Sequence, residues 1–227
     1  MSDKKTGLNV SNVLVMSHQI NLYFIRHAHV AYYTDQGSRY TVPHFKHHLT
    51  PLGWAQAIEL DYLLAQSGIK FSKIYSSPYA RAVETITPFS IRTQKSIEIK
   101  WDLREVYTGA TYSIWNEKMS QNPYSHIGDG ESKTSVIARF SREIQEILKI
   151  ANEGDNLIVV SHGAIMECFL EHVFPDQKIN MVWPDAYKLV FKHGHFSDFE
   201  RLESLIPSNI SSHKDLNIYP KLVMGEE

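Results

Sequence analysis

Short apolar runs alternate along the chain with longer stretches in which apolar residues recur at helical spacing. The short runs are rich in β-branched and aromatic residues, which favour strands. They predict strands at Leu22–Ile25, Ile74–Ser76, Ile97–Trp101, Leu157–Ser161 and Tyr187–Phe191, with a short edge strand at Phe199–Leu202. Because helical patterns separate most of these runs, the sequence predicts an α/β domain built round a mostly parallel sheet.

Capping signals mark where the predicted helices begin and end. Thr50-Pro51 and Ser77-Pro78 each place a capping hydroxyl before a proline, which is typical of a helix start. The second of these helices is expected to end near Thr87, because Pro88 follows it. The remaining predicted helices are one that Ser132 opens and Gly154 stops, and one that spans Ala164 to Val173.

Three stretches show no regular period. Residues 1–18 are expected to be a flexible leader, and residues 19–227 a single domain without linker or repeat. Within that domain, residues 106–130 place aromatic side chains among Gly, Ser, Asn and Pro, which predicts a functional flap. Residues 32–48 are expected to form the opposite wall of the same site.

Composition and charge narrow the class of protein. The 227 residues are 43% hydrophobic and 21% charged, an ordinary globular balance, and the net charge is -2. This charge gives no reason to expect nucleic acid or a membrane surface as partner, and no apolar run reaches the roughly 20 residues of a membrane-spanning helix. The lone Cys168 excludes an internal disulfide and fits a reducing compartment, so a cytoplasmic location is expected.

Conspicuous polar groups follow four of the predicted strands. They are Arg26-His27, the SSPYAR stretch of residues 76–81, the LRE stretch of residues 103–105, and Ser161-His162. Taken singly, such a histidine is more often structural, Arg81 a solvated charge and Glu105 a surface carboxylate. In a parallel sheet, however, ligands gather outside the carboxyl ends of the strands, so we expect the four junctions to converge on one site.

Together these junctions would supply two arginines, two histidines and a carboxylate. Guanidinium groups suit the oxygens of a phosphoryl group, and Arg81 also lies near a predicted helix start, which favours an anion. A neutral imidazole can attack phosphorus, and a second imidazole can stabilise the charge of the transition state. A carboxylic acid can protonate the leaving oxygen, so the set predicts phosphotransfer without metal or other cofactor.

The motifs that carry these residues resemble the histidine phosphatase superfamily, also called the phosphoglycerate mutase-like superfamily. From about Leu22 to Val173 the chain shows, in the family's order, FIRHAHV, LTPLGWAQA, IYSSPYARAVET, LRE, DGES and VVSHGAIM. The resemblance implies a three-layer α/β/α sandwich, which agrees with the alternation of strands and helices.

The resemblance also implies roles for individual residues. His27 matches the nucleophile that becomes phosphorylated, and His162 matches the second catalytic histidine, which also contacts the phosphoryl group. Arg26 and Arg81 match the two phosphate-binding arginines, and Glu105 resembles the proton donor. The expected partners are a small phosphorylated substrate and, as product, inorganic phosphate.

Two departures from the family's usual pattern bear on the activity. The common RHG is RHA here, with Ala28 after the histidine, as in some branches of the family. Mutases of the glycolytic type show Asn-x-x-Asn-x-Phe-x-Gly-Trp after the histidine, and residues 30–48 do not. We therefore predict hydrolysis of a phosphomonoester, with a phosphomutase and a non-catalytic phosphate-binding module as the alternatives.

Two further clusters are given structural interpretations. His44, His47 and His48 lie close together, but no carboxylate or cysteine accompanies them, so a solvated loop is favoured over a metal site. The Gly130-Glu131-Ser132 turn is interpreted as the cap of a long helix, without a catalytic role. The sequence makes no prediction of oligomeric state or of the particular substrate.

Overall fold

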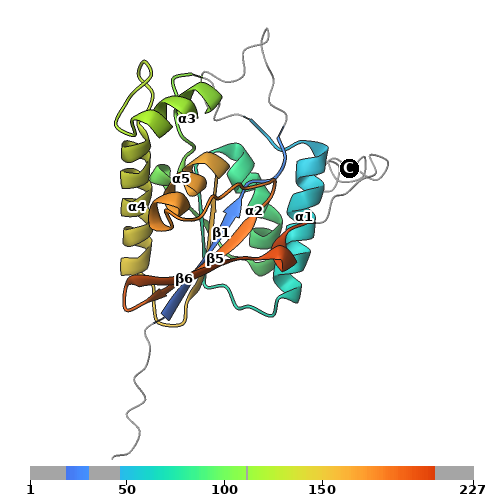
Figure 1. The fold of residues 1–227 in the computed structure, drawn as a ribbon. Coiled ribbons are helices and arrows are strands. Elements are labelled where there is room, and N and C mark those ends of the chain that lie inside the picture. The colour runs from blue at the N-terminus through green and yellow to red at the C-terminus, as the bar shows by residue number, and fades with distance from the viewer. Residues whose placement is uncertain (1–18, 31–46, 111, 208–227) are drawn as a thin grey trace, which may run out of the picture.

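The computed structural model describes residues 19–30, 47–110 and 112–207 of the chain, which build a central sheet covered by helices (Figure 1). The strands are β1 (Gln19–Arg26), β2 (Lys73–Ser76), β3 (Ile97–Ile99), β4 (Asn156–Ser161), β5 (Ala186–Lys192) and β6 (His195–Arg201). Their order in the sheet is β3-β2-β4-β1-β5-β6. The first four strands run parallel, whereas β5 and β6 are antiparallel additions beside β1, so the predicted mostly parallel sheet is confirmed.

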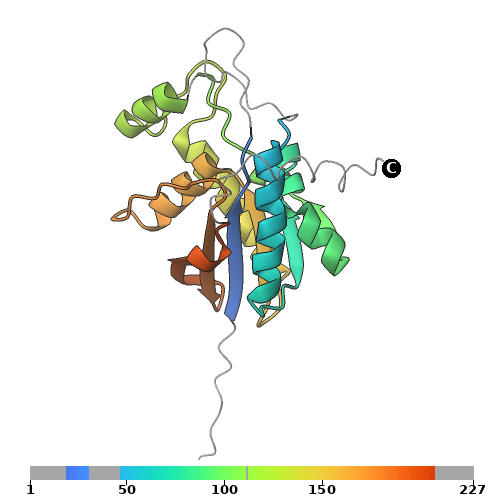
Figure 2. The ribbon, with the colours of Figure 1, turned by 90° about the vertical axis from the view of Figure 1, so that its right-hand side faces the viewer.

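Helices cover both faces of this sheet, as Figures 1 and 2 show. On one face lie α1 (Pro51–Gln66) and α2 (Ala80–Thr93), and on the other α4 (Lys133–Lys149) and α5 (Gly163–Val173). Thr50 and Ser132 cap α1 and α4 as predicted, because their hydroxyl oxygens accept from the backbone N–H of Gly53 at 3.1 Å and Ser135 at 3.2 Å. The fold is the expected three-layer α/β/α sandwich.

Alternation along the central strands builds the two cores. In β1, Leu22 and Phe24 pack in the cluster that includes α4 and α5, whereas Tyr23 and Ile25 pack against α1 and α2. Adjacent residues of a strand point to opposite faces, so a strand buried on both sides reads as a continuous apolar run. This burial anchors β1 in the middle of the sheet and fixes the position of the residues that follow it.

The predicted end of α2 at Pro88 is wrong, because the helix continues to Thr93. A proline inside a helix removes one hydrogen bond and costs about 3 kcal/mol. The turn that follows contributes the buried ring of Phe89, which is 4% exposed, and burying such a ring stabilises by roughly 1.5–3 kcal/mol. Tertiary packing therefore offsets the local penalty.

The predicted irregular segment, residues 106–130, contains a helix that the sequence pattern did not predict. This helix, α3 (Tyr112–Gln121), buries Trp115 and Met119, four residues apart on one face. Two apolar residues are too few to give a clear period over ten positions. β3 also ends two residues before the predicted Trp101, where a 3-10 turn (Trp101–Leu103) replaces the strand.

Some of the predictions concern residues outside the described part of the chain. The predicted leader (1–18) and most of the predicted wall, including His44, lie outside the described part of the chain. Within that part, no helix is both long and apolar enough to cross a bilayer.

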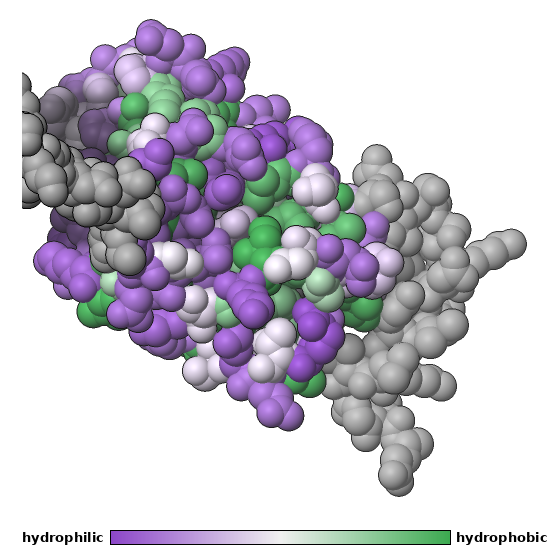
Figure 3. All heavy atoms as spheres, turned by 90° about the horizontal axis from the view of Figure 1, so that it is seen from below, coloured by the Kyte–Doolittle hydropathy of each residue, from purple (hydrophilic) through white to green (hydrophobic). Residues whose placement is uncertain are grey.

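The face at the amino ends of the parallel strands mixes hydrophilic and hydrophobic residues (Figure 3). A hollow of about 430 Å³ between the ends of α1 and α2 is lined by residues such as Leu64, Phe71 and Phe89. Arginine and lysine also line it, but no histidine or carboxylate does, so this hollow lacks the predicted chemistry.

Candidate active site

The four polar junctions meet at the carboxyl edge of the sheet, as expected. Strands β2, β4 and β1 are neighbours and run parallel, so their ends lie side by side. Backbone hydrogen bonds tie the tips together: His27 N donates to Ser161 O at 3.0 Å, and Ser77 N donates to Val160 O at 2.9 Å. The tertiary structure therefore brings residues from widely separated parts of the sequence into one cluster.

His27 follows β1 directly, and its ring is fully buried. Its Nδ1 lies 2.8 Å from the carbonyl oxygen of Ala28, which can only accept, so Nδ1 carries the proton. Nε2 is then the unprotonated nitrogen, and it accepts a hydrogen bond from Arg81 Nε at 3.2 Å. Burial, with the charges of Arg81 and Arg26, holds the pKa of His27 well below its ordinary value and keeps the ring neutral.

Arg81 occupies the first turn of α2 and is only 3% exposed. Its guanidinium carbon lies 4.8 Å from the centre of the Tyr79 ring. Thr85, one turn later, donates to Arg81 O at 2.6 Å and accepts from the backbone N–H of Ala28 at 2.9 Å. This threonine thus couples the start of α2 to the segment that carries His27.

Arg26 is the last residue of β1 and is half-buried. Its guanidinium donates to the carbonyl of Met181 and stacks 4.8 Å from the centre of the Trp183 ring. Its Nε is buried and has no hydrogen-bond partner among the described residues. Gly163 makes room for this side chain, because a Cβ there would lie 2.8 Å from the guanidinium carbon.

His162 is also fully buried, and it precedes the first residue of α5. Its ring centre lies 5.1 Å from that of His27. Nε2 lies 2.7 Å from the hydroxyl of Ser77, and Nδ1 has no partner within the described part of the chain. Burial, followed by the charge of Arg81, holds the pKa of His162 well below its ordinary value.

Glu105 comes from the loop after the 3-10 turn and reaches the amino end of α5. Its Oε1 accepts from the backbone N–H of Val106 at 2.9 Å and of Ile165 at 3.3 Å. Burial raises the pKa of Glu105 above its ordinary value, although the charge of Arg81 opposes the shift. A carboxyl with a raised pKa retains its proton to higher pH, which suits a proton donor.

The assembled cluster is short of hydrogen bonds. Arg26 Nε and His162 Nδ1 are buried polar atoms without a partner in the described ranges. Leaving such groups unsatisfied costs about 1–3 kcal/mol each, and more for charged ones. Both would be satisfied by an anion whose oxygens accept from Arg26 Nε and from a protonated His162 Nδ1.

The prediction that Ser77 caps a helix is wrong, because α2 begins at Ala80 with Tyr79 at its N-cap position and no side-chain cap. The Ser77 hydroxyl instead contacts His162. Thr85, which accepts from the backbone N–H of Ala28, was not singled out from the sequence, although it stands inside the IYSSPYARAVET motif. Only the fold shows that these two polar residues, Ser77 and Thr85, are buried, since both are 0% exposed.

Ala28 shows no strain and fills an apolar space. It belongs to a small buried cluster with Val30, Leu49 and Ala57. Its φ is not among the positive values of non-glycine residues in the described part of the chain, so its backbone does not require a glycine. The methyl group of this residue, which is next to His27 in the chain, thus packs in the core.

His48, from the predicted histidine loop, pairs with Glu84. Its Nδ1 lies 2.5 Å from Glu84 Oε1, and Glu84 Oε2 accepts from Leu49 N at 2.8 Å. Glu84, which belongs to the IYSSPYARAVET motif, thus binds the two residues His48 and Leu49 shortly before α1.

Comparison with known sequences agrees with the geometry. The sequence model of the histidine phosphatase superfamily (branch 1) matches residues 22–189. A broad-specificity phosphatase of Saccharomyces cerevisiae is 27% identical over 168 residues, which are 67% of this chain and 69% of the relative.

Solved structures share the fold. A phosphoglycerate mutase from Bacillus anthracis superposes with a TM-score of 0.67 at 20% identity, covering 84% of this chain and 95% of the other. A phosphoserine phosphatase from Entamoeba histolytica, in complex with 3-phosphoglyceric acid, superposes with a TM-score of 0.65 at 21% identity, covering 82% and 100%. The architecture is therefore phosphoglycerate mutase-like.

Proposed function

The chain belongs to the histidine phosphatase superfamily, and on that premise we propose that it hydrolyses phosphomonoesters through a phosphohistidine on His27. The observation that carries the proposal is the buried pair of His27 Nε2 and Arg81 Nε, 3.2 Å apart, together with Arg26 Nε and His162 Nδ1, two buried atoms without a hydrogen-bond partner among the described residues. A neutral imidazole nitrogen next to anion-binding donors is the arrangement that attack on a phosphoryl group requires.

In the first step, His27 Nε2 attacks phosphorus while the bond from phosphorus to the leaving oxygen breaks. Arg81 Nε exchanges its bond to Nε2 for one to a phosphoryl oxygen, and Arg26 binds a second oxygen. His162 donates from Nδ1, because a Ser77 hydroxyl that donates to Nε2 leaves the ring proton on Nδ1. Glu105 transfers its proton to the departing oxygen.

In the second step, a water molecule attacks phosphorus and the bond to His27 Nε2 breaks. Glu105, now ionised, accepts the proton of that water, and phosphate leaves. The carbonyl of Ala28 stabilises the phosphorylated ring throughout, because it accepts from Nδ1–H at 2.8 Å. No metal or other cofactor takes part in this scheme.

In this scheme, side chains of the site must move before a substrate can reach His27. His27 and His162 are 0% exposed and Arg81 is 3% exposed. The two arginines must also exchange their present acceptors, His27 Nε2 and the Met181 carbonyl, for phosphoryl oxygens. A structure with vanadate bound would have to show the ring of His27 in contact with the anion.

We propose small phosphorylated metabolites as substrates and the cytoplasm as the location. A yeast relative that is named a broad-specificity phosphatase supports a range of phosphomonoesters. Cys168 is the single cysteine of the sequence, which fits a reducing compartment. Burial raises the pKa of its thiol to about 12 and makes it unreactive.

Trapping the intermediate tests this proposal. The protein is mixed with ³²P-labelled para-nitrophenyl phosphate in EDTA and quenched in alkali. We expect protein-bound label that survives alkali and is released by acid, and turnover that EDTA does not change. Turnover without label, or turnover that EDTA abolishes, would contradict the scheme.

The pH dependence of kcat/KM follows from two opposite pKa shifts. His27 must be neutral, and burial lowers its pKa well below 6.5. Glu105 must be protonated, and burial raises its pKa above 4.5. We therefore expect an optimum on the acid side of neutrality, with activity falling on the alkaline side as Glu105 ionises. A profile that keeps rising to alkaline pH would exclude Glu105 as the acid.

A further inference from the structure

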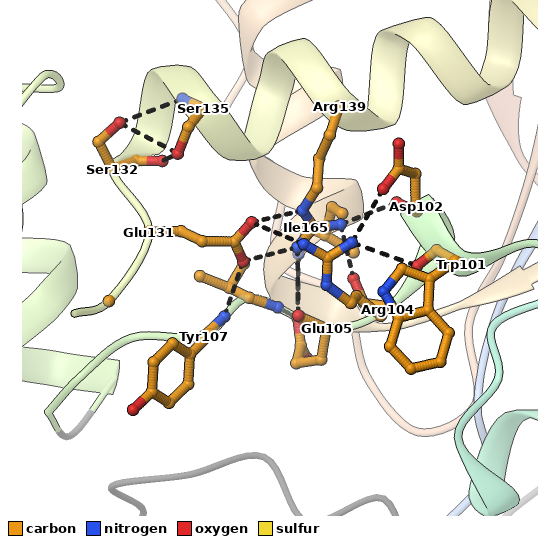
Figure 4. A network of polar contacts seen from close by, with 12 residues as sticks. Trp101, Asp102, Arg104, Glu105, Tyr107, Glu131, Ser132, Ser135, Arg139 and Ile165 are labelled. Atoms are coloured by element: carbon orange, nitrogen blue, oxygen red, sulfur yellow. Dashed lines mark hydrogen bonds and ion pairs between the residues drawn. The ribbon is translucent and has the colours of Figure 1, made fainter.

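An ion pair between the buried Arg139 and the partly buried Glu131 lies next to Glu105 but has no role in the proposed chemistry. Arg139 of α4 is 5% exposed, and it binds Glu131 through two parallel bonds, Nε to Oε1 at 2.6 Å and Nη2 to Oε2 at 2.9 Å (Figure 4). Burial alone would raise the pKa of Glu131, but the bonds from Arg139 more than offset it and hold the pKa below its ordinary value. Glu131 is therefore ionised near neutral pH.

The remaining donors of Arg139 hold the loop that carries Glu105. Nη1 donates to the carbonyl oxygens of Asp102 at 2.8 Å and Arg104 at 2.9 Å, and Nη2 donates to that of Glu105 at 3.2 Å. A guanidinium has five N–H donors, and here each has an acceptor. Three of the five bonds end on the backbone immediately before or at the proposed acid.

Glu131 holds the same loop from the other side of Glu105. Its Oε2 accepts from Tyr107 N at 3.0 Å, and its own N–H donates to Tyr107 O at 2.6 Å. The indole N–H of Trp115 donates to Glu131 O at 2.6 Å, which ties the turn to α3. The loop is thus clamped at residues 102–105 by Arg139 and at residue 107 by Glu131.

We propose that the Glu131–Arg139 pair is a positioning device that aims the carboxyl of Glu105 at the leaving oxygen. This inference rests on the proposed function. An acid must lie within hydrogen-bond reach of the oxygen it protonates, and a misplacement of about 1 Å can cost on the order of a hundredfold in rate. Because the clamp grips the backbone on both sides of Glu105, its loss would move this carboxyl before it moves the phosphate-binding arginines, which belong to β1 and α2.

Substrates with different leaving groups separate this role from a purely structural one. A nitrophenolate departs as a stable anion and needs little help from an acid, whereas the alkoxide of beta-glycerophosphate must be protonated. A displaced Glu105 should therefore slow hydrolysis of the alkyl ester selectively. A general loss of folded protein would lower both rates by the same factor.

The test compares kcat/KM for the two esters in four variants. Arg139→Lys keeps the charge but loses the forked donors, and Glu131→Gln keeps the size but loses the charge. Glu105→Gln is the reference for loss of the acid. Arg142→Gln is the matched control, because Arg142 lies on the same helix and binds the Asp102 carboxylate at 2.7 Å, yet its side chain is 64% exposed.

We expect Arg139→Lys and Glu131→Gln to lower kcat/KM for beta-glycerophosphate about ten- to a hundredfold and that for para-nitrophenyl phosphate less than about threefold. Arg142→Gln should leave both unchanged. Equal losses on both esters, or none, would overturn the positioning role. If Arg139→Lys does not fold, the ratio of the two kcat/KM losses in Glu131→Gln decides whether the pair positions Glu105.

Glu105→Gln separates failure of this inference from failure of the proposed function. If Glu105→Gln discriminates between the esters and the clamp variants do not, the acid role stands and the positioning role is wrong. If Glu105→Gln does not discriminate, Glu105 is not the acid, and both ideas are overturned. Phosphohistidine trapping still reports on the nucleophile in either case.

Discussion

Replacing His27 with alanine is expected to abolish phosphate release from para-nitrophenyl phosphate, with kcat falling by roughly 10⁴-fold or more. The substitution removes the nitrogen that would bond to phosphorus and that accepts a hydrogen bond from Arg81 Nε. The same variant should show no alkali-stable label after reaction with ³²P-labelled substrate. Phosphate release and label are measured in one quenched sample.

The control for this experiment is His172→Ala. His172 lies on the exposed side of α5, so its removal should change neither activity nor label. His27 is buried, so its replacement by alanine leaves a cavity that lowers stability. Thermal unfolding of both variants therefore has to be measured, to check that each one is folded. Activity or label retained in folded His27→Ala protein would remove this residue as the nucleophile.

Replacing Arg81 with alanine is expected to lower kcat/KM by about 10²- to 10³-fold. This guanidinium donates directly to His27 Nε2, and in the proposed mechanism it transfers that hydrogen bond to a phosphoryl oxygen. Removing its charge should also raise the pKa of His27, because Arg81 is the largest charge effect that lowers it. The acid limb of the pH–rate profile should therefore move to higher pH, a change that a loss of folding would not produce.

Two further variants serve as comparisons for Arg81→Ala. Arg92→Ala is the matched control, because Arg92 lies in the last turn of the same helix and binds Asp61 at 2.8 Å with a side chain that is 43% exposed. Its activity should equal that of the wild type. Arg81→Lys should recover only part of the activity, since an ammonium lacks the planar fork. Full activity in Arg81→Ala would show that this residue does not bind the phosphoryl group.

The positions of the strands and of the strand-tip residues followed from local pattern and a general rule of topology. An apolar run such as Leu22–Ile25, buried on both faces, has few alternatives to a central parallel strand. Because parallel strands end at one edge of a sheet, Arg26-His27 and Ser161-His162 could be placed together without coordinates. The motifs then indicated the family.

The continuation of α2 and the presence of α3 depended on contacts that no local window contains. Pro88 is a helix breaker by itself, and only the burial of Phe89 against the core makes the longer helix favourable. In α3 only two residues, Trp115 and Met119, pack against the core among the described residues. Two apolar positions are too few to show a helical period in the sequence.

The sequence by itself therefore determined the architecture and the residues at the strand ends, because hydrophobic periodicity is a local property and parallel strands share an edge. Only the tertiary structure decided which groups support them. Ser77 meets His162 across 85 residues of chain, and Arg139 meets the carbonyl of Asp102 across 37. Hydrogen bonds between distant segments leave no periodic mark in the sequence, since each partner is defined by the folded position of the other.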